Sequence, residues 1–274
     1  MVKYTKVESF SSEDRASKRA ASLKEAFSIH PGEIVSLVGG GGKTTLMFAL
    51  AQELTSSGQS VITTTTTRIF EPSASDACLI VETSEKKMLN LLLHKLDSYR
   101  HITLASERLP SGKLKGISPG LVAALAGLVA YTIVEADGAA RKPLKAPNAT
   151  EPVIPQSTSL VIPVVGIDAL GLKLTADNAF RPELISRLTR LPLGGIISAD
   201  AIATLITHAR GIIKGSPAHS RIVPLINKMD LARGLAEAEN LASRILDKRH
   251  PRIERVVLGQ LQSRPPVVEI IQAT

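Results

Sequence analysis

The sequence predicts a doubly wound α/β fold, in which a mostly parallel sheet carries helices on both faces. Short apolar runs of Val, Ile and Leu alternate with longer segments of helical periodicity along most of the 274 residues, which is typical of βαβ units. The chain has no tryptophan and only 3% aromatic residues, so its core is aliphatic, as in buried parallel sheets. We expect one domain over residues 18–274, preceded by a polar, flexible arm at residues 1–17.

Local signals place the elements in chain order. Pro31-Gly32 is a turn before the first strand, Ser84 and Ser198 are helix caps, and Ser118-Pro119 begins a helix with proline at its first position. The expected helices are 20–27, 44–56, 84–99, one beginning at 118, 181–190, 200–209 and 231–248. The expected strands are 34–38, one opening at 61–63, 77–81, 101–105, 131–134, 160–165, 222–226 and 255–258. Pro163 predicts a bulge or an end in its strand, because proline cannot donate to a ladder.

A glycine run between the first strand and the first long helix is a candidate phosphate-binding loop. It consists of Gly39, Gly40, Gly41 and Gly42, followed by Lys43, Thr44 and Thr45. Glycines let the backbone turn its N–H groups inward, and a ring of donors at a helix N-terminus binds polyphosphate. Lys43 reaches the β- and γ-phosphates in such loops, and the Thr44 hydroxyl ligates Mg²⁺. The compact G-G-x-G-K-T form resembles P-loop NTPases such as metal-insertion GTPases and dethiobiotin-synthetase-like ligases. We therefore predict a P-loop nucleotide-binding domain that uses Mg²⁺ with GTP or ATP.

Five threonines, Thr63 to Thr67, continue the second strand and end at Arg68. Threonine suits strands, so the run fits a plain edge strand. It fits a functional role equally well, because ligands of open α/β sheets bind at the carboxyl ends of the strands. In that role the hydroxyls would hold Mg²⁺ or its waters, and Arg68 would neutralise charge on a transferred phosphoryl group.

The apolar strand at 131–134 ends in Glu135-Ala136-Asp137-Gly138. An apolar strand that delivers carboxylates at its tip orders Mg²⁺ and its waters in phosphoryl chemistry. Glu135-x-x-Gly138 also resembles the E-x-x-G of nickel-insertion and related GTPases, whose glycine N–H meets the γ-phosphate. We predict Thr44, Glu135 and Asp137 as the metal site. The predicted catalytic residues are Lys43, Arg68, Glu135 and Asp137.

Basic residues follow these carboxylates in a loop stiffened by Pro143 and Pro147. Arg141, Lys142 and Lys145 fit a site for a second anionic ligand, or a lid over the first. An ordinary surface loop explains them equally well.

Asn227-Lys228-Met229-Asp230 closes the strand at 222–226. Asn-Lys-x-Asp is the guanine-reading motif of GTPases, in which the aspartate accepts from two guanine N–H groups. The lysine stem lies along the base and the asparagine pins the loop. Because the motif follows the glycine loop and the carboxylates in the order that GTPases use, we predict Asn227, Lys228 and Asp230 as base-binding residues.

Composition argues against several other classes of protein. The net charge is +8, but Lys and Arg are scattered without a long basic run, which favours a solvated surface and a polyanion pocket over a nucleic-acid partner. Cys78 is the only cysteine, so no internal disulfide or thiolate cluster forms within one chain. The N-terminal residues lack a signal-peptide core, and the longest apolar run, 121–134, is too short for a bilayer. We expect a cytoplasmic protein without a membrane partner, whose oligomeric state stays open.

The chain carries, in this order, Gly-Gly-Gly-Gly-Lys-Thr-Thr, Thr-Thr-Thr-Thr-Thr-Arg-Ile-Phe, Glu-Ala-Asp-Gly-Ala, Lys-Pro-Leu-Lys-Ala-Pro and Gly-Ile-Asp-Ala-Leu-Gly. In the order and wording of these motifs the chain resembles the YqeC-like family, described as accessory proteins of selenium-dependent molybdenum hydroxylases. The resemblance implies a role in maturing such an enzyme or its cofactor, with the hydroxylase or a cofactor-processing protein as partner.

Two functions of different classes fit these residues. The first is a Mg²⁺-dependent GTP-binding protein that hydrolyses slowly and assists enzyme maturation. The second is a kinase or ligase that uses ATP or GTP on a cofactor precursor, bound by Arg141, Lys142 and Lys145. A nucleotide-binding scaffold that never hydrolyses is a third alternative.

Overall fold

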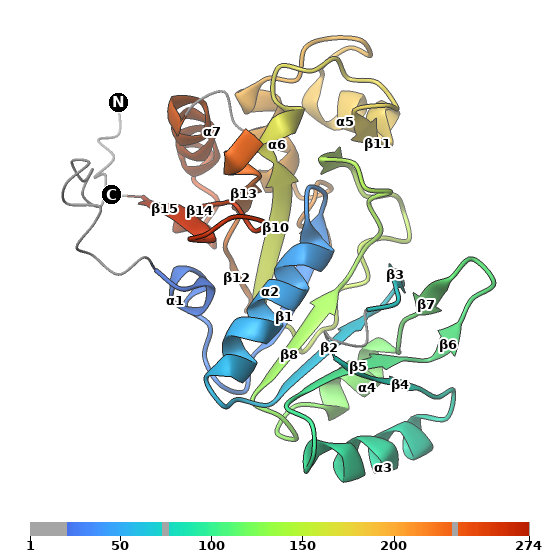
Figure 1. Ribbon diagram of the computed structural model, residues 1–274. Coiled ribbons are helices and arrows are strands. Elements are labelled where there is room, and N and C mark those ends of the chain that lie inside the picture. Colours follow the sequence, from blue (N-terminus) through green and yellow to red (C-terminus); the bar gives the residue numbers. More distant parts are fainter. Residues whose placement is uncertain (1–20, 73–76, 232–234, 274) are drawn as a thin grey trace.

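The computed structural model describes residues 21–72, 77–231 and 235–273. The arm expected at residues 1–17 lies outside them. Within the described part, a ten-stranded sheet has the order β15-β14-β13-β10-β1-β8-β2-β5-β4, with β12 beside β10 (Figure 1). Its strands pair in parallel, except that β15 runs antiparallel to β14. The predicted doubly wound, mostly parallel α/β fold is confirmed.

The elements have the following bounds. The main sheet contains β1 (Ile34–Gly39), β2 (Val61–Thr65), β4 (Cys78–Val81), β5 (His101–Ala105), β8 (Tyr131–Glu135), β10 (Leu160–Gly166), β12 (Arg221–Ile222), β13 (Leu225–Asn227), β14 (Arg255–Gly259) and β15 (Val267–Gln272). The helices are α1 (Leu23–Phe27), α2 (Lys43–Ser56), α3 (Glu85–Leu96), α4 (Pro119–Ala124), α5 (Pro182–Thr189), α6 (Ala199–Thr207) and α7 (Leu235–Asp247), with 3₁₀ turns η2 (Ile167–Ala169) and η3 (Met229–Leu231). Two small sheets join β3 (Arg68–Phe70), β7 (Lys113–Lys115) and β6 (Glu107–Arg108), and β9 (Leu144–Lys145) with β11 (Ala179–Phe180).

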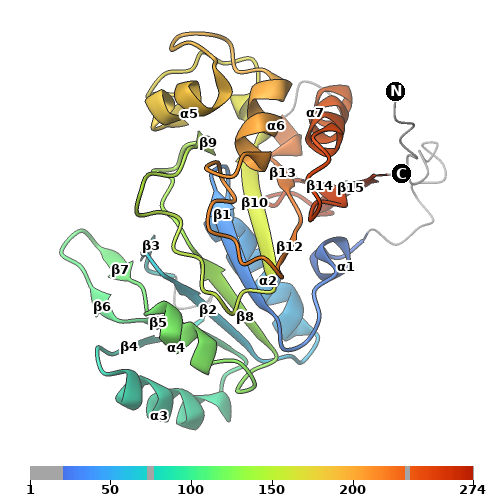
Figure 2. The same ribbon diagram turned by 180° about the vertical axis from the view of Figure 1, so that it is seen from behind.

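Side chains of the central strands alternate between two faces, as pleated strands require. Val164 packs in the cluster with α1 and α2, whereas its neighbour Val165 packs in the cluster with α6 and α7. Ile34 and Val134 lie on the Val165 side and pack with α3 and α4. Figure 1 shows α2 in front of the sheet, and Figure 2 shows α4 and α6 on the opposite side. The sheet is therefore covered on both faces.

The helices begin where serine caps were predicted. Ser84, Ser118 and Ser198 each accept a hydrogen bond from the backbone N–H three residues later, which satisfies a donor that the helix itself leaves unused. Pro119 is the first residue of α4, where its missing N–H has no consequence.

Two strand interpretations are wrong. The threonine run is not an edge strand, because β2 lies between β8 and β5 and its threonines are buried. Hydrogen bonds compensate for that burial: Thr64 Oγ1 donates to Leu104 O at 2.8 Å, and Thr65 Oγ1 donates to Glu135 O at 2.7 Å. Pro163 marks neither a bulge nor an end, since it lies within β10. On one side it pairs with Val38, and on the other it lies at the break between β12 and β13, where no donor is needed.

Position within the sheet decides where a ligand can bind. The chain runs from β1 to β2 and β5 on one side, and later places β10 on the other side of β1. Such a reversal opens a crevice at the carboxyl ends of the strands. The glycine loop, the residues after β8 and the Asn227 motif all leave the sheet at that edge.

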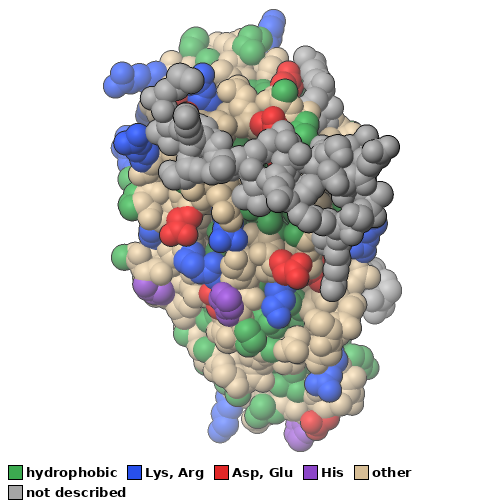
Figure 3. Space-filling view, turned by 90° about the vertical axis from the view of Figure 1, so that its left-hand side faces the viewer, with side chains coloured by type: hydrophobic (Ala, Val, Ile, Leu, Met, Phe, Trp, Pro, Cys, Tyr) green, Lys and Arg blue, Asp and Glu red, His purple; other side chains and the backbone are tan. Residues whose placement is uncertain are grey.

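The face of the molecule shown in Figure 3 carries side chains of both charges. On that face Lys and Arg side chains lie among Asp and Glu side chains, outside the grey atoms. This face matches the solvated surface expected from scattered basic residues.

Candidate functional site

The first three glycines of the loop pack tightly against the protein. The N–H of Gly39 donates to Asp137 Oδ2 at 3.0 Å, that of Gly40 to Val164 O at 2.9 Å, and that of Gly41 to Lys142 O at 3.0 Å. A Cβ on Gly40 would lie 2.6 Å from Lys142 O. Glycine is therefore required for this packing, and these three amides already have acceptors.

The backbone N–H groups at the start of α2 make no hydrogen bonds within the helix. Its first backbone hydrogen bond runs from Leu46 N to Gly42 O at 2.9 Å, so the N–H groups of Lys43, Thr44 and Thr45 have no partner inside the helix. The segment from Gly41 to Thr45 lines a cavity of about 680 Å³. These donors and the positive end of the helix dipole suit this wall of the cavity to phosphate groups.

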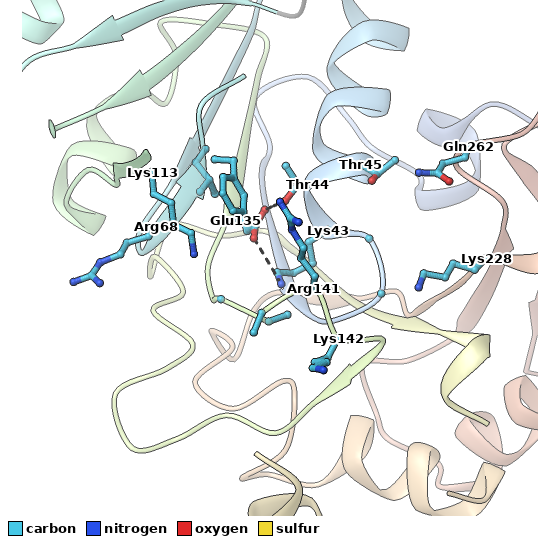
Figure 4. A pocket seen from close by; sticks show the side chains of 17 residues that line it. Lys43, Thr44, Thr45, Arg68, Lys113, Glu135, Arg141, Lys142, Lys228 and Gln262 are labelled. Carbon is cyan, nitrogen blue, oxygen red and sulfur yellow. Dashed lines mark hydrogen bonds and ion pairs between the residues drawn. The ribbon is translucent and has the colours of Figure 1, made fainter. Parts of the chain in front are cut away.

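The carboxylates at the end of β8 lie beside this wall, because Leu37 of β1 pairs with Glu135, the last residue of β8. Thr44 Oγ1 donates to Glu135 Oε2 at 2.7 Å. Lys43 Nζ lies 3.7 Å from Glu135 Oε1 and 3.2 Å from Asp137 Oδ1. Figure 4 shows Lys43, Thr44 and Glu135 together at the centre of the cavity. The structure thus brings together four residues that the sequence placed in one site.

Burial and charge set the protonation of this group. Burial raises the pKa of Glu135, although Lys43 and the Thr44 hydroxyl act to lower it. Burial acts to lower the pKa of Lys43, but the charges of Asp137 and Glu135 outweigh it and the pKa is raised. Lys43 therefore stays cationic near neutral pH, while Glu135 accepts a proton more readily than an exposed glutamate.

Asp137 faces a second lysine rather than the cavity. Its Oδ2 lies 2.9 Å from Lys145 Nζ, which lies 3.0 Å from Glu151 Oε2, and the same oxygen of Glu151 lies 2.9 Å from Arg181 Nη1. We call the five residues Lys43, Asp137, Lys145, Glu151 and Arg181 the ion chain. Asp137 is 1% exposed and Lys145 0%, so both side chains are closed to solvent. Neither lines the cavity described above.

These positions change the roles of two predicted residues. Asp137 holds the loop through the Gly39 amide and is engaged by two lysines, which makes it a positioning residue. Lys145 is buried in the ion chain, where its ammonium faces Asp137 and Glu151 rather than open solvent. Its neighbours in the basic loop do line the cavity: Arg141 has its Cζ 4.8 Å from the Phe70 ring centroid. Lys142 also lines it, and its Nζ donates to Asp177 O at 2.7 Å.

Asn227 connects the base-binding motif to the glycine loop. Its Nδ2 donates to Gly41 O at 2.8 Å, and its Oδ1 accepts from Leu261 N at 3.2 Å. Lys228 lines the cavity and has its Nζ 2.7 Å from Asp168 Oδ2. Asp230 is exposed, in η3. The asparagine therefore pins the loop, as such a motif requires, while the aspartate is open to solvent.

The cavity has two distinct ends. In Figure 4, Lys228 and Gln262 lie on one side of Lys43, and Arg68 and Lys113 lie on the other. The first end adjoins the Asn227 motif, and the second lies beyond the carboxylates of β8. A nucleotide with its phosphates at the start of α2 would have its base near Lys228 and its terminal phosphate toward Arg68.

Oxygen ligands at the cavity wall fit Mg²⁺, which is a hard cation that keeps several waters and is held by one or two protein oxygens plus phosphates. Thr44 Oγ1 and Glu135 Oε2 supply this donor set, 2.7 Å apart. Among the described residues, no group of three or more His, Cys, Asp or Glu side chains could hold a metal by itself. With a nucleotide-bound Mg²⁺ in place, Thr44 Oγ1 would be the direct protein ligand and Glu135 would hold the waters around the ion, with Asp137 behind them.

Sequence reasoning missed several residues of this region. Glu151 joins Lys145 to Arg181, and Phe70, Lys113 and Gln262 line the cavity. Phe70 closes the Thr-Thr-Thr-Thr-Thr-Arg-Ile-Phe motif but was given no role, and no motif marks the other three, which come from separate loops and a short strand. The six-residue spacing from Lys145 to Glu151 corresponds to no helix face.

Comparison with known proteins decides the family. A family model described as "YqeC protein" matches residues 35–183, more than half of the chain. The chain belongs to the YqeC family. A protein of Escherichia coli (strain K12) named "Uncharacterized protein YqeC" is 30% identical over 243 residues, which cover 85% of this chain and 90% of that protein. The matched region of the YqeC model contains the glycine loop, the β8 carboxylates and the whole ion chain.

One further expectation concerns membranes. In the part of the chain that the structure describes, none of the helices combines the length and the apolarity that crossing a bilayer demands.

Proposed function

We propose that this protein binds a nucleoside triphosphate with Mg²⁺, prefers guanine, and hydrolyses it slowly. The observation that carries this proposal is that Lys43, Thr44, Glu135 and the unused amides of α2 line one wall of one cavity. Donors and a cation for phosphates, with a hydroxyl and a carboxylate for Mg²⁺, are the parts that phosphoryl chemistry needs.

The proposed chemistry uses these groups in distinct roles. A water oxygen forms a bond to the γ-phosphorus, the bond to the β–γ bridging oxygen breaks, and the nucleoside diphosphate leaves. Lys43, held in place by Asp137, stabilises the negative charge on the phosphates. Glu135 takes the proton of the attacking water, a role that its raised pKa favours. Bound Mg²⁺ would neutralise charge on the β- and γ-phosphate oxygens.

A guanine preference is supported by the position of Lys228 at one end of the cavity and by the link from Asn227 to the loop. Asp230 is open to solvent in the turn that follows and would accept from the guanine N–H groups.

The cellular role that we propose is accessory, in the maturation of a selenium-dependent molybdenum hydroxylase or its cofactor. It is supported by the resemblance of five motifs of this chain to those of the YqeC-like family so described. Phosphoryl transfer to a small molecule is a second candidate function, favoured by another cavity beside the proposed phosphate end.

Two assays test the proposal. Displacement of labelled GTP by unlabelled GTP or ATP measures the base preference, and we expect GTP to compete at least about tenfold better than ATP. Release of inorganic phosphate measures hydrolysis. Lys43→Ala should abolish it, whereas Lys86→Ala, on the exposed side of α3, is the matched control and should leave it unchanged. Equal competition by ATP would remove the guanine preference, and equal phosphate release by both variants would remove the assigned site.

A further inference from the structure

A second cavity of about 850 Å³ adjoins the first. Both are lined by Arg68, Lys113, Gly138 and Ala140. These shared residues form a common wall between the two cavities, and two of them, Arg68 and Lys113, lie at the end of the first cavity opposite Lys228 and Gln262 (Figure 4). The second cavity therefore begins where the terminal phosphate of the proposed nucleotide would end.

Four cations and two carboxylates line this second cavity. Its two carboxylates are both engaged: Glu85 accepts from Ser118 Oγ at 2.6 Å, and Glu151 belongs to the ion chain, where Lys145 and Arg181 outweigh the effect of burial and lower its pKa. A net positive wall attracts anions. The lining cations are Arg68, Lys113, Lys115 and Arg181, of which Arg181 pairs with Glu151 and Lys115 has its Nζ 3.7 Å from Glu107 Oε2 at the surface.

Arg181 is fixed at the edge of this cavity. Its guanidinium is 2.9 Å from Glu151 Oε2, and its Cζ is 4.5 Å from the centroid of the Phe180 ring. Its backbone has φ of 62°, a conformation that non-glycine residues with long side chains rarely adopt and that often marks a functional position. Ala140 of the common wall also has positive φ, at 48°.

We propose that the second cavity binds a small phosphate-bearing molecule beside the terminal phosphate of the nucleotide. Two arginines and two lysines suit phosphate, which arginine binds in bidentate geometry. The volume lies in the range of small-molecule sites, about 300–1,000 Å³. This proposal deepens the proposed function, on which it rests for the nucleotide in the first cavity. It places the second ligand at Arg68, Lys113, Lys115 and Arg181 instead of at Arg141, Lys142 and Lys145.

Nuclear magnetic resonance of the ¹⁵N-labelled full chain tests the proposal. The first cavity is filled with Mg²⁺ and GMP-PNP, and the chain is titrated with ribose 5-phosphate or with ribose, which lacks only the phosphate. We expect ribose 5-phosphate to shift the amide signals of Ser106, Gly116 and Gly138, and ribose to leave them in place. Lys115→Gln changes a residue that lines only the second cavity and should weaken this binding about fivefold. Lys86→Gln should not.

Each result decides the question. Shifts in the second cavity that need the phosphate and weaken in Lys115→Gln support the proposal. Three results would overturn it while leaving the nucleotide site intact. They are no shift while GMP-PNP is bound, equal shifts with ribose and ribose 5-phosphate, and equal affinities of the Lys115→Gln and Lys86→Gln variants for ribose 5-phosphate. If GMP-PNP itself does not bind, the proposed nucleotide function fails. The amide signals of Ser106, Gly116 and Gly138 then show whether ribose 5-phosphate binds to the second cavity without nucleotide.

Discussion

Replacement of Lys145 by methionine tests the ion chain behind the glycine loop. The change keeps a long apolar side chain and removes an ammonium that is 0% exposed. In the structure that ammonium lies 2.9 Å from Asp137 Oδ2 and 3.0 Å from Glu151 Oε2. Lys145→Met therefore leaves two carboxylates with one cation fewer.

The magnitude follows from what each carboxylate keeps. Removing one partner of a buried ion pair costs about 3–5 kcal/mol. Asp137 retains the Gly39 amide at 3.0 Å and Lys43 at 3.2 Å, and Glu151 retains Arg181 at 2.9 Å. We therefore expect the lower end, about 3 kcal/mol, which corresponds to about 6–12 °C in Tm for a chain of this size.

Urea unfolding followed by circular dichroism measures this loss, since the chain has no tryptophan for fluorescence. The matched control is Lys142→Met, in the same loop, which removes only the hydrogen bond to Asp177 O at 2.7 Å and should cost about 0.5–1.5 kcal/mol. Adding Asp137→Asn to Lys145→Met should cost less than the sum of the two single changes. A loss of under 1 kcal/mol for Lys145→Met would refute the ion chain as a stabilising element.

Three further changes probe the site. Gly40→Ala places a Cβ 2.6 Å from Lys142 O and should weaken nucleotide binding by at least about tenfold in calorimetry; unchanged affinity would contradict the tight loop packing. Asp230→Ala should remove a guanine preference of about 1.4 kcal/mol and leave affinity for the phosphates intact, so a preference that survives rules out the aspartate as base reader. Lys145 and Arg181 outweigh burial and lower the pKa of Glu151 below its ordinary 4.5. The stability that Glu151 contributes is therefore present above the unfolded pKa and lost as pH falls through the folded one. Urea unfolding across pH should show wild type and Glu151→Gln converging in acid, and a constant gap would count against the pairing.

Much of the fold could be predicted because parallel strands leave a strong local signal. Aliphatic runs marked the central strands, and serine caps marked α3, α4 and α6. The antiparallel β15 was not predicted, although it pairs with β14, the strand just before it in the chain, and its residues include the β-branched Val267, Ile270 and Ile271. The threonines of β2 looked like an edge strand because the hydrogen bonds that allow their burial come from neighbouring strands and are invisible in a local window.

Part of the candidate site could likewise be predicted from the sequence, and part could not. Lys43, Thr44 and Glu135 could be found because each stands at the junction of a strand with a loop or helix, where sequence order implies position. Lys145 was assigned to an exposed loop, but its short strand β9 pairs with β11 across a long connection and the side chain is buried. Only the folded structure shows that its ammonium forms ion pairs with Asp137 and Glu151.

The proposed function requires that a triphosphate binds at the start of α2, with Lys43 at its phosphates. Calorimetry with Mg²⁺ and GMP-PNP, on the wild-type chain and on Lys43→Ala, tests it most directly. We expect binding to the wild type and an affinity about 10- to 100-fold lower for the variant, the equivalent of one charged hydrogen bond. Equal affinity for the two proteins, or no heat of binding with the wild type, would contradict it.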